Sequence, residues 1–277
     1  MDAPLNQIFF PASFHELFSA WGRFPDAVPF AGGTGITARQ GKNVIQLPQR
    51  ILCLDKLQEL HRITRTEHYL EIGSMIKLNR LIRLGKVVPD VLCRCLEKIC
   101  GVQLRNIATI GGNICCPARL CDASAPLTAL DAQYELRSVN SARWVAASRF
   151  HSSEERKVLE NQELLTRIRL PIHKWDYSTY KKFYSEDIFK TRGLVFLART
   201  QKSILSDIRV IFKGDVIIRN KSAEGILTGK HLPLNRKAAG DFIEDWNKFL
   251  ADNNEIDDFT KHELVNSIEE DVYNLSE

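Results

Sequence analysis

The chain has 277 residues, a formal net charge of +4 and a hydrophobic content of 44%. This length exceeds what one compact core usually holds, so two or three packed subdomains are expected. Opposite charges are interspersed without a basic block, which argues against a nucleic-acid-binding protein. No apolar stretch approaches the roughly 18–20 residues that span a bilayer, and no secretory signal is recognisable. A cytoplasmic protein without membrane contact is expected, with its seven cysteines as reduced thiols.

Helix and strand patterns alternate over the first part of the chain. Ser13 and Glu16 form a capping box at the start of a predicted helix. The buried stripe of this helix has the spacing i, i+3, i+4 and i+7: Phe14, Leu17, Phe18 and Trp21. Strands are predicted at residues 27–30, 43–47 and 51–54, so a first subdomain ends near residue 55. A hairpin is predicted at 63–66 and 69–72, helices at 77–84, 90–100 and 126–131, and strands at 134–137, 143–145 and 164–170.

The pattern changes after Pro171. Short apolar segments predict a small antiparallel sheet, and two amphipathic segments predict closing helices. The strands are expected at residues 181–184, 193–199, 208–212 and 216–218, and the helices at 236–250 and 260–275. A domain boundary is therefore expected between residues 171 and 176.

The first of two glycine-rich loops follows the strand predicted at residues 27–30 and reads Phe30-Ala31-Gly32-Gly33-Thr34-Gly35-Ile36. Consecutive glycines permit positive φ angles and let backbone N–H groups converge on an anion without an intervening Cβ. A diphosphate suits such a nest. The alternative is an ordinary glycine turn that joins a strand to a helix.

The second loop reads Ala108-Thr109-Ile110-Gly111-Gly112-Asn113-Ile114 and is expected to be a glycine-centred turn. It repeats the same chemistry, with a hydroxyl, paired glycines and an amide side chain, and its alternative is a tight turn with a satisfied asparagine. Neither loop matches the single-loop patterns of Rossmann or P-loop nucleotide sites. Two loops from different segments could instead supply donors to both sides of one dinucleotide diphosphate.

These loops and the residues around them carry a resemblance to a known family. Arg105-Asn106 precede the second loop, Asp122 follows it, and Glu163-Leu164-Leu165 stand ahead of Pro171. In this order and spacing, the chain resembles the FAD-binding, middle subunit of molybdopterin dehydrogenases from about Phe10 to Gly229. That family includes xanthine dehydrogenase and carbon monoxide dehydrogenase.

The resemblance implies an α+β fold. A VAO/PCMH-type FAD-binding domain of two α/β subdomains would cover residues 1–172, with subdomains of about 1–55 and 56–172. A small C-terminal α/β domain, similar to that of carbon monoxide dehydrogenase flavoproteins, would cover residues 173–277.

The resemblance also implies which residues bind FAD. The two loops would hold the diphosphate, Asp122 would lie near the ribityl–ribose part, and Leu165 would contact the flavin or adenine side. The residues carried over are Pro29, Phe30, Ala31, Gly32, Gly33, Thr34, Gly35, Ile36, Thr109, Gly111, Gly112, Asn113, Asp122, Leu165 and Lys182. Apart from the resemblance, Asp122 could equally be a helix N-cap, and Lys182 a solvated strand residue.

The chain departs from the family pattern at three places, one of which is Ile99, where eukaryotic relatives often have an aromatic residue. Glu186 stands where many members have an arginine shortly after the lysine matched by Lys182, which affects any anion or NAD contact from this segment. Cys115, Cys116 and Cys121 lie where relatives usually carry small polar residues.

Six cysteines lie between residues 93 and 121, which raises the alternative of an iron–sulfur cluster. No C-x-x-C pair is present, and on a helix Cys93 and Cys95 would point to different faces. Buried structural thiols are favoured, with a redox role for Cys115, Cys116 or Cys121 left open. Because the histidines are scattered, no metal site is predicted in this chain. The resemblance implies that the cofactor carries the chemistry, so no catalytic residue is expected.

The resemblance implies that the chain would be an FAD-containing electron-transfer subunit of a molybdenum hydroxylase. Electrons would pass from iron–sulfur centres in a partner chain through FAD to NAD or another acceptor. A molybdopterin-binding large subunit and a [2Fe–2S] small subunit are the expected partners. Two alternatives are a stand-alone flavin reductase and a scaffold subunit without flavin.

Overall fold

The computed structural model describes residues 6–38, 45–116, 121–152, 158–183 and 192–276. The chain forms two compact units. Unit 1 comprises Met1–Val88, Ile99–Pro117 and Asp131–Ile172, and unit 2 comprises Pro89–Lys98, Ala118–Leu130 and His173–Glu277. One passage between the units falls at residue 172, where a domain boundary is expected, but two short earlier segments also belong to unit 2. The domain assignment stays a prediction.

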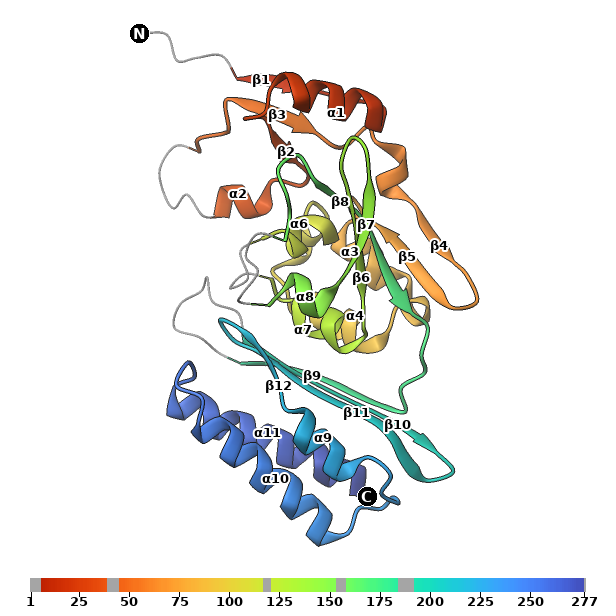
Figure 1. Ribbon diagram of the computed structural model, residues 1–277, viewed down its shortest axis with the longest axis vertical. Coiled ribbons are helices and arrows are strands. Elements are labelled where there is room, and N and C mark those ends of the chain that lie inside the picture. Colours follow the sequence, from red (N-terminus) through yellow and green to blue (C-terminus); the bar gives the residue numbers. More distant parts are fainter. Residues whose placement is uncertain (1–5, 39–44, 117–120, 153–157, 184–191, 277) are drawn as a thin grey trace. The chain divides into compact units, whose positions relative to one another are not determined.

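The first layer of unit 1 is a parallel sheet with the strand order β1-β3-β2, covered by helix α1 (Figure 1). The Ser13 hydroxyl accepts the Glu16 N–H at 3.2 Å, and the Glu16 carboxylate accepts the N–H of Ala12 at 2.9 Å. Helix α1 buries Leu17 and Trp21, as its spacing predicts. The elements of this layer are β1 (Gln7–Phe9), α1 (Phe14–Arg23), β2 (Val28–Phe30), α2 (Thr34–Ala38) and β3 (Arg50–Cys53).

The strand predicted at residues 43–47 is wrong where the structure describes it. Residues 45–47 are irregular, and their two apolar side chains, Ile45 and Leu47, are 53% and 39% exposed. An apolar alternation predicts a strand only if one face is buried, and here neither apolar residue reaches the core. Residues 43 and 44 lie outside the described part of the chain.

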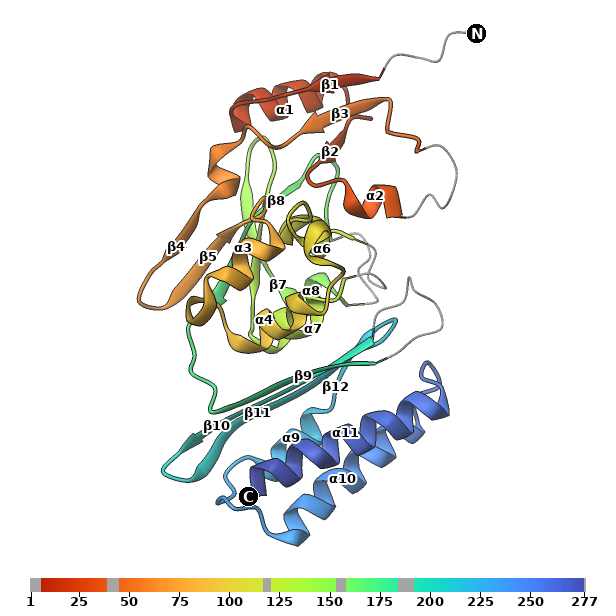
Figure 2. The same ribbon diagram turned by 180° about the vertical axis from the view of Figure 1, so that it is seen from behind.

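The second layer of unit 1 is an antiparallel sheet in the order β4-β5-β8-β6-β7, with short helices beside it (Figure 2). The predicted hairpin and the strands near residues 135, 144 and 167 are confirmed. Its strands are β4 (Ile63–Arg65), β5 (Tyr69–Gly73), β6 (Gln133–Arg137), β7 (Ala142–Ala146) and β8 (Leu164–Pro171). Its helices are η1 (Gln58–His61), α3 (Leu78–Arg83), η2 (Gly85–Val87), α5 (Val102–Arg105), α6 (Ile110–Ile114) and α8 (Ala147–Phe150).

A bidentate ion pair fastens β7 to the start of β8 and gives unit 1 a pH dependence. Arg143 donates to the two carboxylate oxygens of Glu163 at 2.7 and 2.8 Å. Burial alone would raise the pKa of Glu163, but hydrogen bonds from Arg143 and from the Glu160 backbone hold it below its usual value. A lowered folded-state pKa gives stability that is present above the unfolded pKa and lost as the pH falls through the folded one.

We therefore expect Glu163→Gln to lower the free energy of unfolding at pH 7 by about 1.5–3 kcal/mol, the range for hydrogen bonds to charged groups. The deficit should shrink as the pH is lowered past the usual glutamate pKa, because the wild-type carboxylate is then protonated as well. Urea unfolding of both proteins at pH 7 and under acid conditions measures this. A deficit that does not change with pH would contradict the ionic contribution.

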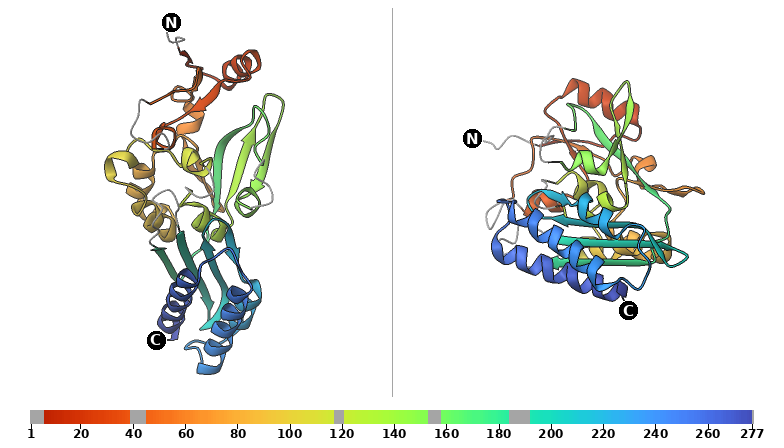
Figure 3. Two further views of the ribbon diagram at one scale, coloured as in Figure 1. Left: turned by 90° about the vertical axis from the view of Figure 1, so that its left-hand side faces the viewer. Right: turned by 60° about the horizontal axis from the view of Figure 1, so that its bottom comes forward.

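Unit 2 is built on an antiparallel sheet in the order β12-β11-β10-β9. Helices α9, α10 and α11 pack on one face of this sheet, and α4 and α7 contact its strands as well (Figure 3). The sheet and the two closing helices predicted after residue 171 are confirmed. The elements are α4 (Asp90–Glu97), α7 (Ser124–Ala129), β9 (Tyr177–Phe183), β10 (Arg192–Gln201), β11 (Ile204–Lys213), β12 (Ile217–Arg219), α9 (Lys221–Leu227), α10 (Arg236–Ala251) and α11 (Asp258–Ser276).

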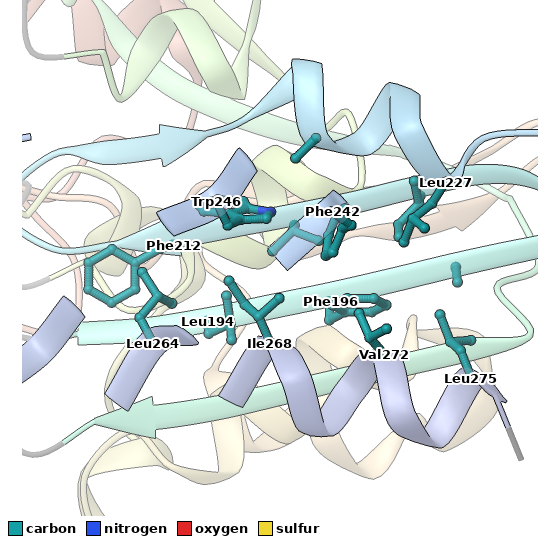
Figure 4. Close-up of a cluster of buried hydrophobic side chains, with 14 of the residues drawn as sticks. Leu194, Phe196, Phe212, Leu227, Phe242, Trp246, Leu264, Ile268, Val272 and Leu275 are labelled. Atoms are coloured by element: carbon teal, nitrogen blue, oxygen red, sulfur yellow. The ribbon is translucent and has the colours of Figure 1, made fainter. Parts of the chain in front are cut away.

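The core of unit 2 lies between its sheet and the closing helices (Figure 4). Phe196 and Phe212 point from the strands toward Phe242 and Trp246 of α10, and all four side chains are at most 1% exposed. Leu264, Ile268 and Val272 of α11 complete this layer.

Candidate functional site

The first glycine loop connects β2 to α2 in unit 1. Gly33 has a φ of +69°, and a Cβ there would lie 2.4 Å from Cζ of the Phe30 ring, so the position requires glycine. At Gly32 glycine is required by a different contact. A Cβ on Gly32 would lie 2.3 Å from the backbone oxygen of Ile107, which directly precedes the second loop.

Three backbone donors of this loop, those of Gly32, Gly33 and Thr34, have no acceptor among the described residues. Ile36 and Thr37 donate their N–H groups to the Gly33 oxygen at 3.0 and 3.1 Å. The amides of Gly32, Gly33 and Thr34 make no hydrogen bond within the described part of the chain. Neighbouring amides of this kind form an anion-binding concavity once a ligand supplies the acceptor.

The second loop is a short helix, α6, rather than the predicted turn. Thr109 is its N-cap and accepts the Gly112 N–H at 3.1 Å. The backbone N–H of Asn113 donates to the Thr109 backbone oxygen, and the backbone N–H of Gly111 donates to the Ser74 backbone oxygen. The amides expected to hold an anion on this loop are therefore already engaged. Gly112 is exposed and Asn113 half-buried, and among the amides of residues 109–113 only that of Thr109 lacks a partner in the described chain.

The two loops lie against each other, as predicted. The close approach of Gly32 to Ile107 brings the end of β2 onto the chain that enters α6, and α2 and α6 lie near each other in both ribbon views (Figures 1 and 2). The Gly111 site is equally tight, because a Cβ there would lie 2.6 Å from that of Ser74. The unpartnered amides of the first loop, together with the close backbone contacts that glycine permits at Gly32 and Gly111, suit the binding of a diphosphate.

Leu165 lies in the same unit but is buried. It is 3% exposed and pairs with Leu136 in the sheet. The next residue, Thr166, accepts the Ser74 N–H at 3.0 Å, and Ser74 in turn accepts the N–H of Gly111. Strand β8 is thus linked to the second loop through Ser74.

Asp122 and Lys182 belong to unit 2 and meet there. The Lys182 ammonium lies 3.1 Å from Oδ1 of Asp122 and donates to the backbone oxygen of Lys98 at 3.0 Å. The contact with Asp122 is an ion pair without hydrogen-bond alignment. The alternative interpretation of Asp122 as a helix N-cap is wrong, because the N-cap of α7 is Ala123 and has no side-chain cap.

Burial dominates the electrostatics around Asp122. The residue is 5% exposed, and burial raises the pKa of its carboxyl against the opposing effect of Lys182 and Lys213. Burial also lowers the pKa of the Lys213 ammonium, and it raises the pKa of the Cys95 thiol, which donates to the Asp122 backbone oxygen at 3.4 Å. Sequence reasoning missed Lys213 and Cys95 here, because they come from distant segments without a common motif.

The cysteines are free thiols, all seven of which lie in the described residues. Burial, with the nearby Asp90 and Glu97 carboxylates, raises the pKa of Cys93 to about 11, so this thiol is protonated at neutral pH and a poor metal ligand. Among the residues with described placement, no three His, Cys, Asp or Glu side chains are grouped to hold a metal ion. Glu186 lies outside the described residues.

Comparison with known families decides the class of protein. Residues 4–173 match the family model described as the FAD binding domain in molybdopterin dehydrogenase. The chain belongs to this family. The expected family, the α+β fold and the class of FAD-dependent oxidoreductase subunits are therefore confirmed.

Individual members of the family show how far the similarity extends. The chain is 30% identical over 220 residues to the xanthine dehydrogenase FAD-binding subunit of Escherichia coli O157:H7, covering 76% of this chain and 74% of that one. It is 26% identical to the carbon monoxide dehydrogenase medium chain of Hydrogenophaga pseudoflava, covering 83% and 82%.

Solved structures share the fold over the whole chain. Reconstituted CO dehydrogenase from Oligotropha carboxidovorans matches with a TM-score of 0.82 at 20% identity, covering 100% of this chain and 99% of that one. Carbon monoxide dehydrogenase from Hydrogenophaga pseudoflava matches with a TM-score of 0.80 at 23% identity, covering 100% and 98%. None of the described helices combines the length and the apolar character needed to cross a membrane.

Proposed function

We propose that the chain binds one FAD, with the diphosphate against the two glycine loops of unit 1. The observation that carries this proposal is the contact of Gly32 with Ile107, beside three amides that have no partner within the described residues. The family model covers both loops. Leu165, Asp122 and Lys182 are proposed as the further FAD-binding residues, as the resemblance implies.

We propose that the chain acts as an electron-transfer subunit. It would take electrons from iron–sulfur centres in a partner chain and deliver them to NAD or another acceptor. A bound flavin supplies the redox chemistry, while the protein supplies binding, orientation and electrostatics. The names of the relatives, an FAD-binding subunit and a medium chain, support a role within a larger assembly. A molybdopterin-binding large subunit and a [2Fe–2S] small subunit are the proposed partners.

Purification from the native source tests both proposals. We expect the chain to be yellow and to contain one FAD. Two partner chains should be purified with it, of which one contains molybdopterin and the other [2Fe–2S] centres. A colourless chain that cannot be reconstituted with FAD would contradict the flavin site and favour a scaffold. Rapid dye reduction by the isolated chain with NADH would favour a stand-alone flavin reductase.

Gly112→Val tests the second loop. A Cβ at Gly112 would lie 2.9 Å from the Thr109 hydroxyl that caps α6, and the valine methyl groups would enter the exposed space above the loop. We expect FAD affinity to fall about tenfold or more. Quenching of flavin fluorescence measures it. The control is Gly240→Val, because nothing lies within 4 Å of a Cβ at that position. Unchanged affinity in Gly112→Val would remove this loop from the site.

A further inference from the structure

The second glycine loop is held along the connection between β5 and α3. The Leu78 amide donates to the Ala108 oxygen at 3.0 Å, and the Ile110 amide donates to the Ile76 oxygen at 2.9 Å. Between these bonds, Lys77 and Thr109 form an isolated antiparallel bridge. Lys77 is thus the direct neighbour of the residue that caps α6, although the two are far apart in sequence.

This pairing determines the position of the Lys77 Cβ atom relative to Thr109. Residues directly opposite each other in an antiparallel pair place their Cβ atoms on the same side, about 4.5–5.5 Å apart. The Thr109 hydroxyl on that side accepts the Gly112 N–H. The Lys77 stem therefore begins beside the start of α6, where Gly112 is exposed, and its flexible four-carbon chain can extend over the loop.

The charge of Lys77 is not balanced by any acidic residue in the described part of the chain. The side chain is half-buried and forms no ion pair with the acidic residues that the structure describes. The two segments that pair at Lys77, residues 73–88 and 99–116, contain no aspartate or glutamate.

A cationic side chain beside the second loop would complement a bound diphosphate. The amides of Gly111, Gly112 and Asn113 are engaged within the chain, so this loop has few backbone donors left for a diphosphate. The first loop offers neutral amides. A diphosphate carries two negative charges, and a lysine ammonium is a common phosphate ligand because it supplies a full charge and three donors.

We propose that Lys77 binds the diphosphate of FAD directly, as the cationic side of the site opposite the amides of Gly32, Gly33 and Thr34. This inference rests on the proposed FAD site. It adds a residue that the family resemblance does not assign. It also implies how the protein distinguishes FAD from flavins that lack a diphosphate. Both the Lys77 charge and the backbone donors of the first loop would favour FAD.

The test compares three ligands in wild-type protein, Lys77→Met and Lys77→Arg. We expect Lys77→Met to weaken FAD about ten- to a hundredfold, the range for a charge-assisted hydrogen bond. ADP, which retains the diphosphate, should lose affinity by the same factor, and riboflavin, which lacks phosphate, should not. Lys77→Arg should keep most of the FAD affinity. Flavin fluorescence and displacement by ADP report these affinities without any assay of turnover.

Lys86→Met is the matched control, because it removes an exposed lysine of the same unit, and its FAD affinity should match wild type. FAD affinity in Lys77→Met within about twofold of wild type would overturn the inference. An equal loss for riboflavin would also overturn it, because Lys77 would then act through the loop's structure. These outcomes differ from failure of the proposed function, in which the wild-type protein itself binds no FAD.

Discussion

Gly32→Val is expected to weaken FAD binding about a hundredfold, which corresponds to about 2.8 kcal/mol. A Cβ on Gly32 would lie 2.3 Å from the Ile107 oxygen and 2.9 Å from the Ile107 carbonyl carbon, so the new side chain meets backbone that cannot rotate away. Overpacking of this kind typically costs about 1–3 kcal/mol, and relief requires the two loops to separate. Titration of the apoprotein with FAD, followed by flavin fluorescence, measures the loss.

Gly22→Val is the control for added bulk. Gly22 lies near the end of α1 in the same unit, and nothing lies within 4 Å of a Cβ at that position. FAD affinity and the unfolding midpoint of this variant should stay near the wild-type values. If Gly32→Val bound FAD as tightly as wild type, contact between the loops would be irrelevant to the cofactor, and the site would have to be sought elsewhere.

Local patterns predicted the fold well where burial and capping agree with them. The capping box of Ser13 with Glu16 and the buried stripe of α1 produce the predicted helix, because the same residues cap the helix and pack into the core. The apolar residues at 45–47 failed as a strand, because their side chains stay exposed. Helices α2 and α6 were missed because short helices that contain glycine have a weak propensity and depend on tertiary contacts.

The site was only partly predictable for a related reason. Glycine pairs indicated two loops, but only the structure reveals that Gly32 packs on Ile107 while the Gly112 amide is used by Thr109. Which donors remain for a ligand depends on hydrogen bonds between distant segments. The same holds for the pairing of Lys77 with Thr109, which no spacing rule contains.

Trp246→Ala is expected to have the largest effect on stability, lowering the free energy of unfolding by about 3–5 kcal/mol. Trp246 is fully buried in unit 2 and packs edge-on against Phe249 with 5.6 Å between ring centroids. Truncation leaves a cavity between α10 and the sheet that the surrounding strands cannot fill. Because domains are typically stable by only about 5–15 kcal/mol, this loss is a large share of the total. Urea unfolding followed by circular dichroism at 222 nm, a helix signal, measures it without relying on the lost fluorophore.

Trp246→Phe separates the cavity from the indole's polar group. The Trp246 indole nitrogen is buried without a hydrogen-bond partner among the described residues, and an unsatisfied donor of this kind is itself unfavourable. Phenylalanine keeps most of the ring volume and removes that donor, so its stability loss should be much smaller than that of alanine. Equal losses in the two variants would mean that the indole nitrogen has a partner, such as a buried water, and that this hydrogen bond rather than ring volume holds α10 against the sheet.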